Sequence, residues 1–526
     1  MDSEFEDYWN SWLQKELSNY KLITDKKTGV QLKKYLKKNY THFDNKFWLP
    51  DRKDELKEIL QNNLKVYNSK LKRTEWWAFS PFLKMLIKTP RYKYSQDEGA
   101  YDLETKIRPI CFAAHVDSVI FSFYAYMLTR KYESFILKEG FGDCVIAYRS
   151  DLGGKCNIQF CKEVFDEVKS RGACSAVALD IKGYFDHIDH RILKDKWGKI
   201  VGGLPDDQFK LFNALTTYSY VNKNNILKKY NVILKKLAKL PNTLLDLVPG
   251  KKDYEKYKRL RDDKLIVVNN AVNKKTKRPI GIPQGSGMSA LLSNIYLIDF
   301  DKDLQEKAIR EGFLYRRYCD DILVVCDSSE AQRLQKFIID KIGLEYHQEI
   351  QSKKVELTEF RLNSAGKIRA FNKKKQIEKS VLTTDALTEK YYYKSLQYLG
   401  FEFDGQNIFI RSASLSRYFR KMKSRIVKTI AMAYSGKSTS NKVWREQLLH
   451  RYTHLGKRNF TTYAYNASKA TYKNSNGEIK DGLDAPSIKR QLARHVDILM
   501  NSLQAKNAQR YRWKASKDKS VIEKNI

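Results

Sequence analysis

Residues 314–325 read Leu-Tyr-Arg-Arg-Tyr-Cys-Asp-Asp-Ile-Leu-Val-Val, and this stretch decides the fold because two short apolar runs meet at adjacent aspartates. Runs of this length are typical of strands that are buried under helices. The pattern predicts strands at 314–318 and 322–326, joined by a tight turn. A turn on such a rigid scaffold directs the carboxylates of Asp320 and Asp321 toward one point.

A second acidic stretch, at residues 176–190, begins with the apolar run Ala-Val-Ala-Leu and continues through Asp180, Gly183 and Phe185. The run at 176–179 predicts a strand that ends at Asp180. An acid at the end of a strand is held in place by the strand. The two stretches together therefore predict three positioned carboxylates.

Three carboxylates that converge at strand ends form an all-oxygen site of the kind that Mg²⁺ uses together with substrate phosphates. In phosphoryl transfer, two such ions about 3.5 to 4 Å apart activate the attacking oxygen and stabilise the leaving oxygen. Adjacent acids in a turn are also common as solvated turn formers. A third element between the two stretches, residues 281–297, favours the catalytic interpretation: Gly285 and Gly287 let the backbone approach a ligand closely, and a helix is predicted at 289–297.

The charge of the chain indicates a polyanionic partner. Its 526 residues include 98 Lys and Arg but 61 Asp and Glu, which gives a formal net charge of +37, and 42% hydrophobic residues are enough for a folded core. Nucleic acid and an anionic membrane surface are the two candidate partners. The most apolar segment, 110–128, contains His115 and Asp117, so we interpret it as a buried amphipathic helix and expect no membrane association.

The N-terminus is acidic and lacks the features of a signal peptide, so we expect a cytoplasmic protein. The seven cysteines form no Cys-x-x-Cys pair, and we predict neither disulfides nor a zinc site. The middle of the chain alternates strands, including 399–403, with helices, which predicts an α+β fold. Apolar spacing of three and four residues predicts helices in four flanking segments, 5–38, 52–72, 411–434 and 486–512, and polar composition predicts loops at 435–441 and 472–484.

The three elements, strand-Asp-x-x-x-x-Phe, Pro-Gln-Gly and Tyr-x-Asp-Asp in this order, resemble the palm motifs of reverse transcriptases. The resemblance extends outward to a fingers motif at 106–110, a lysine-bearing motif at 343–354 and a primer-grip hairpin at 398–401. It covers residues 85–410 in total. It implies a right-hand polymerase with fingers and a palm, whose antiparallel sheet packs on helices, and RNA-directed DNA polymerase activity.

The resemblance also implies roles for individual residues. Asp180, Asp320 and Asp321 would be catalytic and would bind two Mg²⁺ ions, with Mn²⁺ as an alternative, and the carbonyl of Ile181 would be a backbone ligand. Five residues would bind the incoming dNTP. Lys106 and Arg108 would hold the triphosphate, Phe185 would exclude a 2′-hydroxyl, Gln284 would lie near the nascent base pair, and Lys354, rather than Lys353, would protonate the pyrophosphate.

No ribonuclease H or maturation domain follows the palm pattern, and the remaining architecture resembles bacterial abortive-infection and defence-associated reverse transcriptases. We expect a helical N-terminal extension at 1–84, fingers and palm at 85–410 with an insertion at about 197–277, and an all-helical, thumb-like region at 411–526. The resemblance implies antiphage defence, a dedicated structured noncoding RNA as template, a DNA product, and for some members a homo-oligomer.

Three alternatives stay open from the sequence. The chain could be a catalytically weak RNA-binding scaffold, a template-independent DNA polymerase of the abortive-infection type, or an RNA-dependent RNA polymerase, although Phe185 argues against the last. Some related enzymes prime synthesis from a protein hydroxyl. Tyr511, in the basic segment Arg510-Tyr511-Arg512-Trp513, is a candidate for such a hydroxyl.

Overall fold

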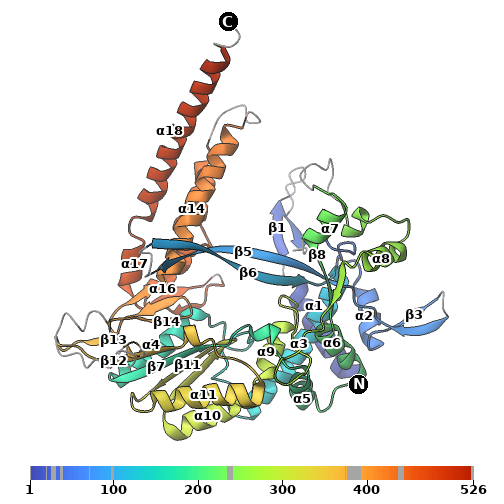
Figure 1. Ribbon diagram of the computed structural model, residues 1–526, viewed down its shortest axis with the longest axis horizontal. Coiled ribbons are helices and arrows are strands. Elements are labelled where there is room, and N and C mark those ends of the chain that lie inside the picture. The colour runs from blue at the N-terminus through green and yellow to red at the C-terminus, as the bar shows by residue number, and fades with distance from the viewer. Residues whose placement is uncertain are drawn as a thin grey trace.

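The computed structural model describes residues 2–18, 20–24, 31–35, 40–69, 72–95, 100–233, 241–373, 375, 392–435, 443–474 and 476–522. At its centre lies a five-stranded antiparallel sheet, shown in Figure 1. Its strands follow the order β10 (Leu314–Tyr318), β11 (Asp321–Cys326), β7 (Cys174–Asp180), β12 (Glu356–Leu362) and β13 (Ile368–Asn372). The strands predicted around the aspartates and the α+β fold are confirmed.

Both faces of the central sheet are covered, which explains why β7 and β11 are apolar runs rather than alternating patterns. Successive side chains point to opposite faces of a strand. Val177 and Ile322 pack into one core, with α3 (His115–Lys138), α5 (His190–Val201), α9 (Ser289–Tyr296), α10 (Ile298–Glu311) and α11 (Ala331–Tyr346). Ala176 and Leu323 pack into the other core, with α4 (Asn157–Arg171), α16 (Phe460–Ser468) and α17 (Pro486–Gln491).

A second sheet lies beside the first and contains a long hairpin. Strands β5 (Phe82–Ser95) and β6 (Ala100–Phe112) form the hairpin, which extends toward α14 in Figure 1. The segment predicted as an insertion contributes to this sheet: β8 (Ser219–Asn222) pairs in parallel with β5, and β9 (Ile266–Val268) pairs with β8. The described part of the segment also contains α6 (Asp206–Thr216), α7 (Lys223–Lys229) and α8 (Asp253–Asp262).

The N-terminal region corrects two predictions. The extension is mixed rather than helical, because it also contains two hairpins. The hairpin of β1 (Tyr20–Thr24) and β2 (Gln31–Tyr35) lies between α1 (Asp2–Leu17) and α2 (Lys53–Gln61), and the hairpin of β3 (Lys65–Asn68) and β4 (Arg73–Trp76) follows α2. The segment 110–128 begins as the end of β6 before α3 starts at His115. His115 and Asp117 are buried in this helix, as predicted.

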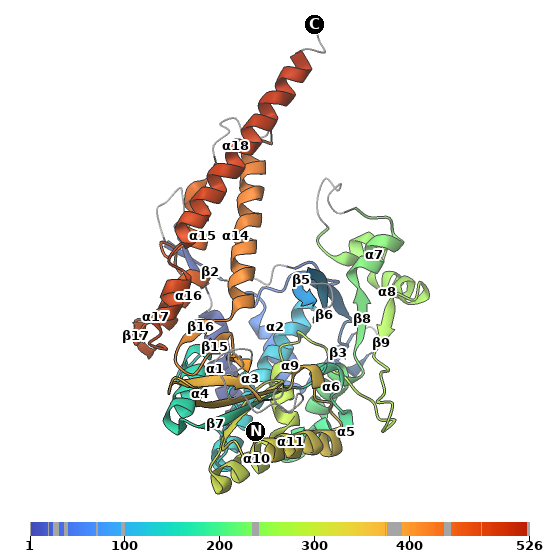
Figure 2. The same cartoon turned by 60° about the vertical axis from the view of Figure 1, so that its left-hand side comes forward.

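The C-terminal region consists mainly of helices that project from the body (Figures 1 and 2). A small sheet of β14 (Leu396–Tyr398), β15 (Phe401–Phe403) and β16 (Ile408–Ile410) leads into α14 (Ser412–Ala433), which lies along α18 (His495–Ile522), with α15 (Arg445–Tyr452) nearby. The region is not all-helical, because 472–484 contains part of the hairpin β17 (Thr471–Lys473) and β18 (Ile479–Asp481) instead of a loop. Most of the loop predicted at 435–441 lies outside the described residues.

A fully buried ion pair lies beneath the turn between β10 and β11. Arg317 and Asp301 are both 0% exposed, and the guanidinium donates two hydrogen bonds to the carboxylate, at 2.7 and 2.5 Å. The same guanidinium donates to the carbonyl of Cys319 at 2.9 Å and to the side chain of Asn294 at 3.3 Å. One buried cation therefore links α9, α10 and the turn that carries Asp320.

Replacing Arg317 with Met should destabilise the protein by about 3–5 kcal/mol, because it leaves the charge of Asp301 buried without a partner. We expect this loss in the free energy of unfolding from urea titration. Arg333→Met is the matched control, since Arg333 forms ion pairs while half exposed and should change stability by less than about 1 kcal/mol. Equal losses in the two variants would contradict the role given to the buried pair.

Candidate active site

The register of the central sheet places the three aspartates together. Asp180 is the last residue of β7, and its partner across the strand pair is Asp321, the first residue of β11. Asp320 precedes Asp321 in the turn, and its carbonyl accepts a hydrogen bond of 3.0 Å from the backbone N–H of Ile181. The structure therefore brings together the four residues predicted as metal ligands.

The turn that holds Asp320 has a strained backbone, and the buried side chain of Arg317 stabilises it. Cys319 has a φ of +59°, a region that side-chain-bearing residues adopt at a cost in free energy. Its carbonyl accepts the hydrogen bond from buried Arg317. Strain of this kind persists only where the surroundings determine the conformation, and the Arg317 guanidinium is such a constraint.

The electrostatics of the site favour a bound cation. Burial and repulsion from Asp180 raise the pKa of the Asp320 carboxyl above its usual value. Desolvation by the surrounding residues, followed by repulsion from Asp320 and Asp180, raises the pKa of Asp321 to about 7, although the residue is exposed at the end of β11. Lys354, in a short 3₁₀ helix at Ser352–Lys354, places its Nζ 2.6 Å from Oδ1 of Asp180. A cation is therefore present at one carboxylate, while the other two repel each other.

Within the described part of the chain, no group of three His, Cys, Asp or Glu side chains is arranged to hold a metal ion. The donor chemistry nevertheless fits a hard divalent cation, because all three side chains offer carboxylate oxygens. The raised pKa values indicate negative charge that the protein leaves partly uncompensated. An ion bound to Asp320 and Asp321 would relieve this repulsion.

The Pro-Gln-Gly loop contacts both the acidic stretch and the hairpin. The carbonyl of Phe185 accepts a hydrogen bond of 2.9 Å from the N–H of Ile282, and the carbonyl of Gln284 accepts one of 2.8 Å from the N–H of Cys111. Gly285 has a φ of +112°, and a Cβ at this position would lie 2.9 Å from the carbonyl oxygen of Cys111. Only glycine permits this approach without a shift. Phe185 itself is half-buried.

Lys106 and Arg108 lie on β6 at two-residue spacing, so they share a face of the hairpin with Ile110. The side chain of Ile110 is 2.9 Å from the position of a Cβ on Gly285. The shared face is therefore the one turned to the Pro-Gln-Gly loop, and both residues are half-buried there. This arrangement agrees with a position beside the nucleotide.

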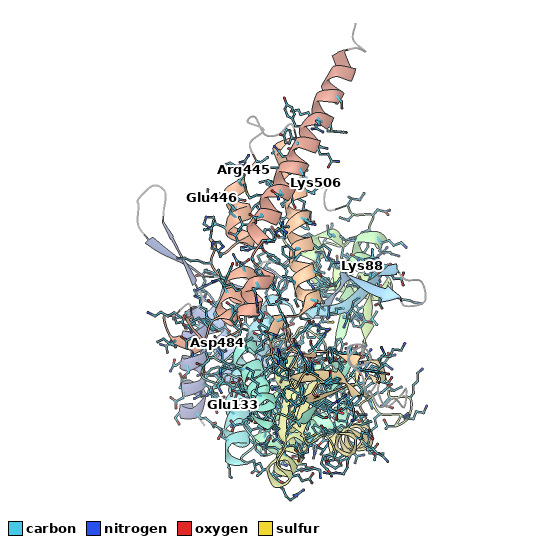
Figure 3. The ribbon with its side chains drawn as sticks, turned by 90° about the vertical axis from the view of Figure 1, so that its left-hand side faces the viewer. Lys88, Glu133, Arg445, Glu446, Asp484 and Lys506 are labelled. Atoms are coloured by element: carbon cyan, nitrogen blue, oxygen red, sulfur yellow. The ribbon has the colours of Figure 1, made fainter. Side chains whose placement is uncertain are left out.

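The structure does not bring Tyr511 to the carboxylates. Its side chain is 64% exposed on α18, the helix that projects from the body. Figure 3 labels Lys506 on this helix, and Tyr511 lies about 7.5 Å further along the axis toward the C-terminal end. A hydroxyl at this position is remote from the aspartates of its own chain.

Sequence reasoning missed a cationic cleft between the hairpin and α14. The cleft has a volume of about 770 Å³, and none of the described residues that line it is acidic. Spacings of three and four residues on a predicted helix would have revealed the basic face of α14. Eight basic residues line the cleft: Lys88, Arg108, Arg417, Arg420, Lys421, Arg425, Lys428 and Arg451. Figure 3 labels Lys88 on the hairpin.

Residues 226–403 match the family model described as reverse transcriptase (RNA-dependent DNA polymerase). The chain therefore carries a reverse transcriptase domain, a family whose description gives RNA-dependent DNA polymerase as its activity. The prediction of this enzyme class is confirmed at the level of the domain. The match includes Asp320 and Asp321 but begins after Asp180, so the third carboxylate is connected to the matched residues by the structure, through the sheet register and the contact with Lys354.

Among curated proteins, none matches the chain. Among solved structures, a telomerase of Candida albicans in complex with a fragment of telomeric RNA is 14% identical with a TM-score of 0.34, over 77% of this chain and 56% of that one. Apo telomerase of Candida tropicalis is 12% identical with a TM-score of 0.36, over 79% of this chain and 60% of that one. The chain thus spans less than two thirds of these proteins, and TM-scores this low say nothing about its activity.

None of the helices in the described ranges is long and apolar enough to cross a membrane.

The raised pKa of Asp321 predicts a pH-dependent stability in the absence of divalent ions. Because the folded protein holds this proton more tightly than the unfolded chain, stability should fall as pH rises from about 4 to 7. Asp321→Asn removes the titration, so its melting temperature should exceed that of the parent at pH 8, with a difference that shrinks toward pH 4. Mg²⁺ should reduce the difference at pH 8 by stabilising only the parent.

Asp327→Asn, at an exposed aspartate just beyond the end of β11, is the matched control and should follow the parent at every pH. Parallel melting profiles for the parent and Asp321→Asn would show that Asp321 is not under electrostatic stress.

Proposed function

We propose that the protein is an RNA-templated DNA polymerase that adds dNTPs at the site formed by Asp180, Asp320 and Asp321. The observation that carries the proposal is the pairing of Asp180 with Asp321 at adjacent strand ends, with Asp320 in the turn beside them. Three carboxylates on one rigid sheet are the donor set that nucleotidyl transfer by two divalent ions requires. The reverse transcriptase domain supplies the class of reaction.

Each side chain then has a specific task. The carboxylates and the Ile181 carbonyl would hold two Mg²⁺ or Mn²⁺ ions, which activate the attacking hydroxyl and stabilise the leaving oxygen. Lys354, whose Nζ lies 2.6 Å from Oδ1 of Asp180, would give a proton to the departing pyrophosphate. Lys106 and Arg108 would bind the triphosphate, and Gln284 would contact the nascent base pair.

The cationic cleft supports a nucleic acid partner. Its five cations on α14 run from Arg417 to Lys428, a length of about 16 Å along the helix. Arg411, just before α14, is close enough to Asp321 to lower its pKa, so the helix begins at the carboxylates and leads away from them. A phosphate backbone leaving the active site would meet one cation after another along this helix.

We further propose a role in antiphage defence, with a dedicated structured noncoding RNA as template. This assignment rests on the resemblance of the domain arrangement, namely an extension at 1–84, fingers and palm at 85–410 and a basic thumb-like region at 411–526. Synthesis primed by a protein hydroxyl belongs to the same proposal. Because Tyr511 lies on the projecting part of α18, priming by this residue would need a neighbouring copy of the chain.

Asp320→Ala together with Asp321→Ala should reduce incorporation of labelled dNTP by at least about a thousandfold, because the ions lose two of their ligands. RNA binding, measured by filter retention, should stay within twofold of the parent. In cells challenged with phage, the same variant should lose protection. The matched control is Asp327→Asn, which should keep both activities.

Incorporation that persists in the double variant would refute the site. Incorporation that is lost without any change in phage protection would refute the defence role and favour an RNA-binding scaffold. Incorporation that proceeds equally without RNA would favour the template-independent polymerase.

Phe185→Ala should admit ribonucleotides, because the ring is expected to occupy the volume of a 2′-hydroxyl. We expect the ratio of kcat/KM for dNTP over rNTP to fall by at least about tenfold, a change of about 1.4 kcal/mol in transition-state discrimination. Phe209→Ala, at a partly exposed ring on α6, controls for the general loss of an aromatic side chain. An unchanged ratio would make Phe185 a packing residue only.

Arg417→Ala combined with Arg425→Ala should weaken RNA binding and flatten its salt dependence. Removing two phosphate contacts should lower the slope of log K against log salt by about 1.4 for a single strand. Lys251→Ala with Lys258→Ala, at exposed positions in and beside α8, removes the same charge elsewhere and should leave the slope nearly unchanged. Equal slopes for both double variants would show that the cleft is not the binding surface.

A further inference from the structure

A second cavity adjoins the catalytic turn on the side away from Lys354. Its volume is about 540 Å³, and it lies between the loop 146–156, the start of α4, the end of β10 and the turn between β14 and β15. Tyr318, the residue before the Cys319–Asp320 turn, forms part of its wall. Since β10 is an edge strand and Lys354 precedes β12, the two features flank the carboxylates from opposite directions.

Tyr148 is the most unusual residue in this cavity. Its side chain is 48% exposed, and its ring lies 6.4 Å from the ring of Tyr318. Its backbone has a φ of +57°, which is rare for a bulky side chain and costs free energy. Leu399, which also lines the cavity, has a φ of +39°. Strained backbone of this kind concentrates at functional sites, where the surroundings hold it.

The surroundings of Tyr148 are rigid on both sides along the chain. The carbonyl of Ala147 accepts a hydrogen bond of 2.7 Å from buried Asn294, which itself contacts the Arg317 guanidinium. The next residue, Arg149, has a side chain only 2% exposed that is paired with Glu133, which Figure 3 labels inside the body. The exposed ring of Tyr148 is thus presented by a segment that buried contacts hold on both sides.

The rim of the cavity offers a group for phosphate. Lys155 lines it, and the ammonium is held 2.8 Å from Glu163 in an ion pair that is exposed to solvent. Exposed pairs of this type contribute little free energy, so the ammonium can turn to a phosphate at small cost. Two tyrosine rings with a lysine at the rim match the chemistry of a nucleotide, whose base or sugar contacts rings while its phosphate contacts a cation.

We propose that Tyr148 and Tyr318 bind the 3′-terminal nucleoside of the strand that is being extended, with Tyr148 as its stacking platform. The proposal rests on the polymerase function proposed above. The incoming nucleotide would take the side of the carboxylates marked by Lys354, so the hydroxyl that attacks it must arrive from the other side. The cavity that contains Tyr148 is on that side and ends at the turn that holds Asp320.

Because its segment is rigid, the hydroxyl of Tyr148 is not suited to prime synthesis. A priming hydroxyl must move away from the carboxylates as the attached strand grows. The backbone of Tyr148 is fixed through Ala147 and Arg149, so a strand attached to it could not advance. Its ring, rather than its oxygen, is therefore the functional group.

The test uses the full-length protein with an RNA template and a DNA primer. Tyr148→Ala should raise the KM for the primer about tenfold, since stacking on an aromatic ring stabilises a base by about one power of ten or more, and should leave the KM for dNTP unchanged. Tyr148→Phe should match the parent in both constants. Tyr67→Ala, at a 68% exposed tyrosine on β3, is the matched control and should also match the parent.

A second readout does not require polymerisation. A primer with 2-aminopurine at its 3′ end should lose fluorescence on binding to the parent and to Tyr148→Phe, but not on binding to Tyr148→Ala at a saturating concentration. Melting temperatures verify that the variants are folded. Quenching that is equal in Tyr148→Ala and the parent would overturn the proposal, as would a Tyr148→Phe variant as impaired as Tyr148→Ala. Failure of the parent to extend any primer would instead refute the proposed function.

Discussion

The pairing of β7 with β11 is the constraint on which the candidate site depends. Side chains alternate between the faces of a strand, so a slip by one residue would move every side chain of β11 to the opposite face. Such a slip would place Ile322 in the core that now receives Leu323 and would separate Asp321 from Asp180. Because both faces of the sheet are packed, the same apolar contacts that fold the sheet also fix the distance between the carboxylates.

Buried polar groups add precision that apolar packing cannot supply. The guanidinium of Arg317 joins Asp301, Asn294 and the carbonyl of Cys319, and Asn294 continues the connection to Ala147. Hydrogen bonds to a charged group are directional and short, so this network fixes the turn and the loop before Tyr148 relative to each other. The stability of the core and the geometry of the site are thus set by the same few side chains.

The sequence predicted those parts of the fold in which the local residue pattern and the surroundings favour the same secondary structure. The runs at 176–179 and 322–326 are apolar because the sheet is buried on both faces, and they were predicted correctly. The N-terminal segment 5–38 was predicted as helix, but Tyr20–Thr24 and Gln31–Tyr35, which share its mixture of lysine and apolar side chains, form strands. Short hairpins are stabilised mainly by their surroundings, which a pattern of spacing does not contain.

The candidate site likewise contains residues that the sequence predicted and residues that it did not. Asp180, Asp320 and Asp321 stand at strand ends that the sequence marks. Tyr148 could not be found, because no residue pattern reveals a positive φ at a bulky side chain. Nothing in the sequence distinguishes Arg317, which is fully buried, from the adjacent Arg316. The burial of Arg317 depends on Asp301, which lies sixteen residues away and becomes a partner only when α10 packs under β10.

The position of β7 between β11 and β12 also bears on how this chain can be divided. A fragment cut at the limits of the family match would contain β10, β11, β12 and β13 but not the strand that joins the two pairs. Each pair would then present a row of unpaired backbone groups, the kind of edge through which strands of different molecules associate. The unit that can be expressed on its own therefore has to begin well before residue 226, and its start is set by the sheet rather than by the stretch of chain that a family shares.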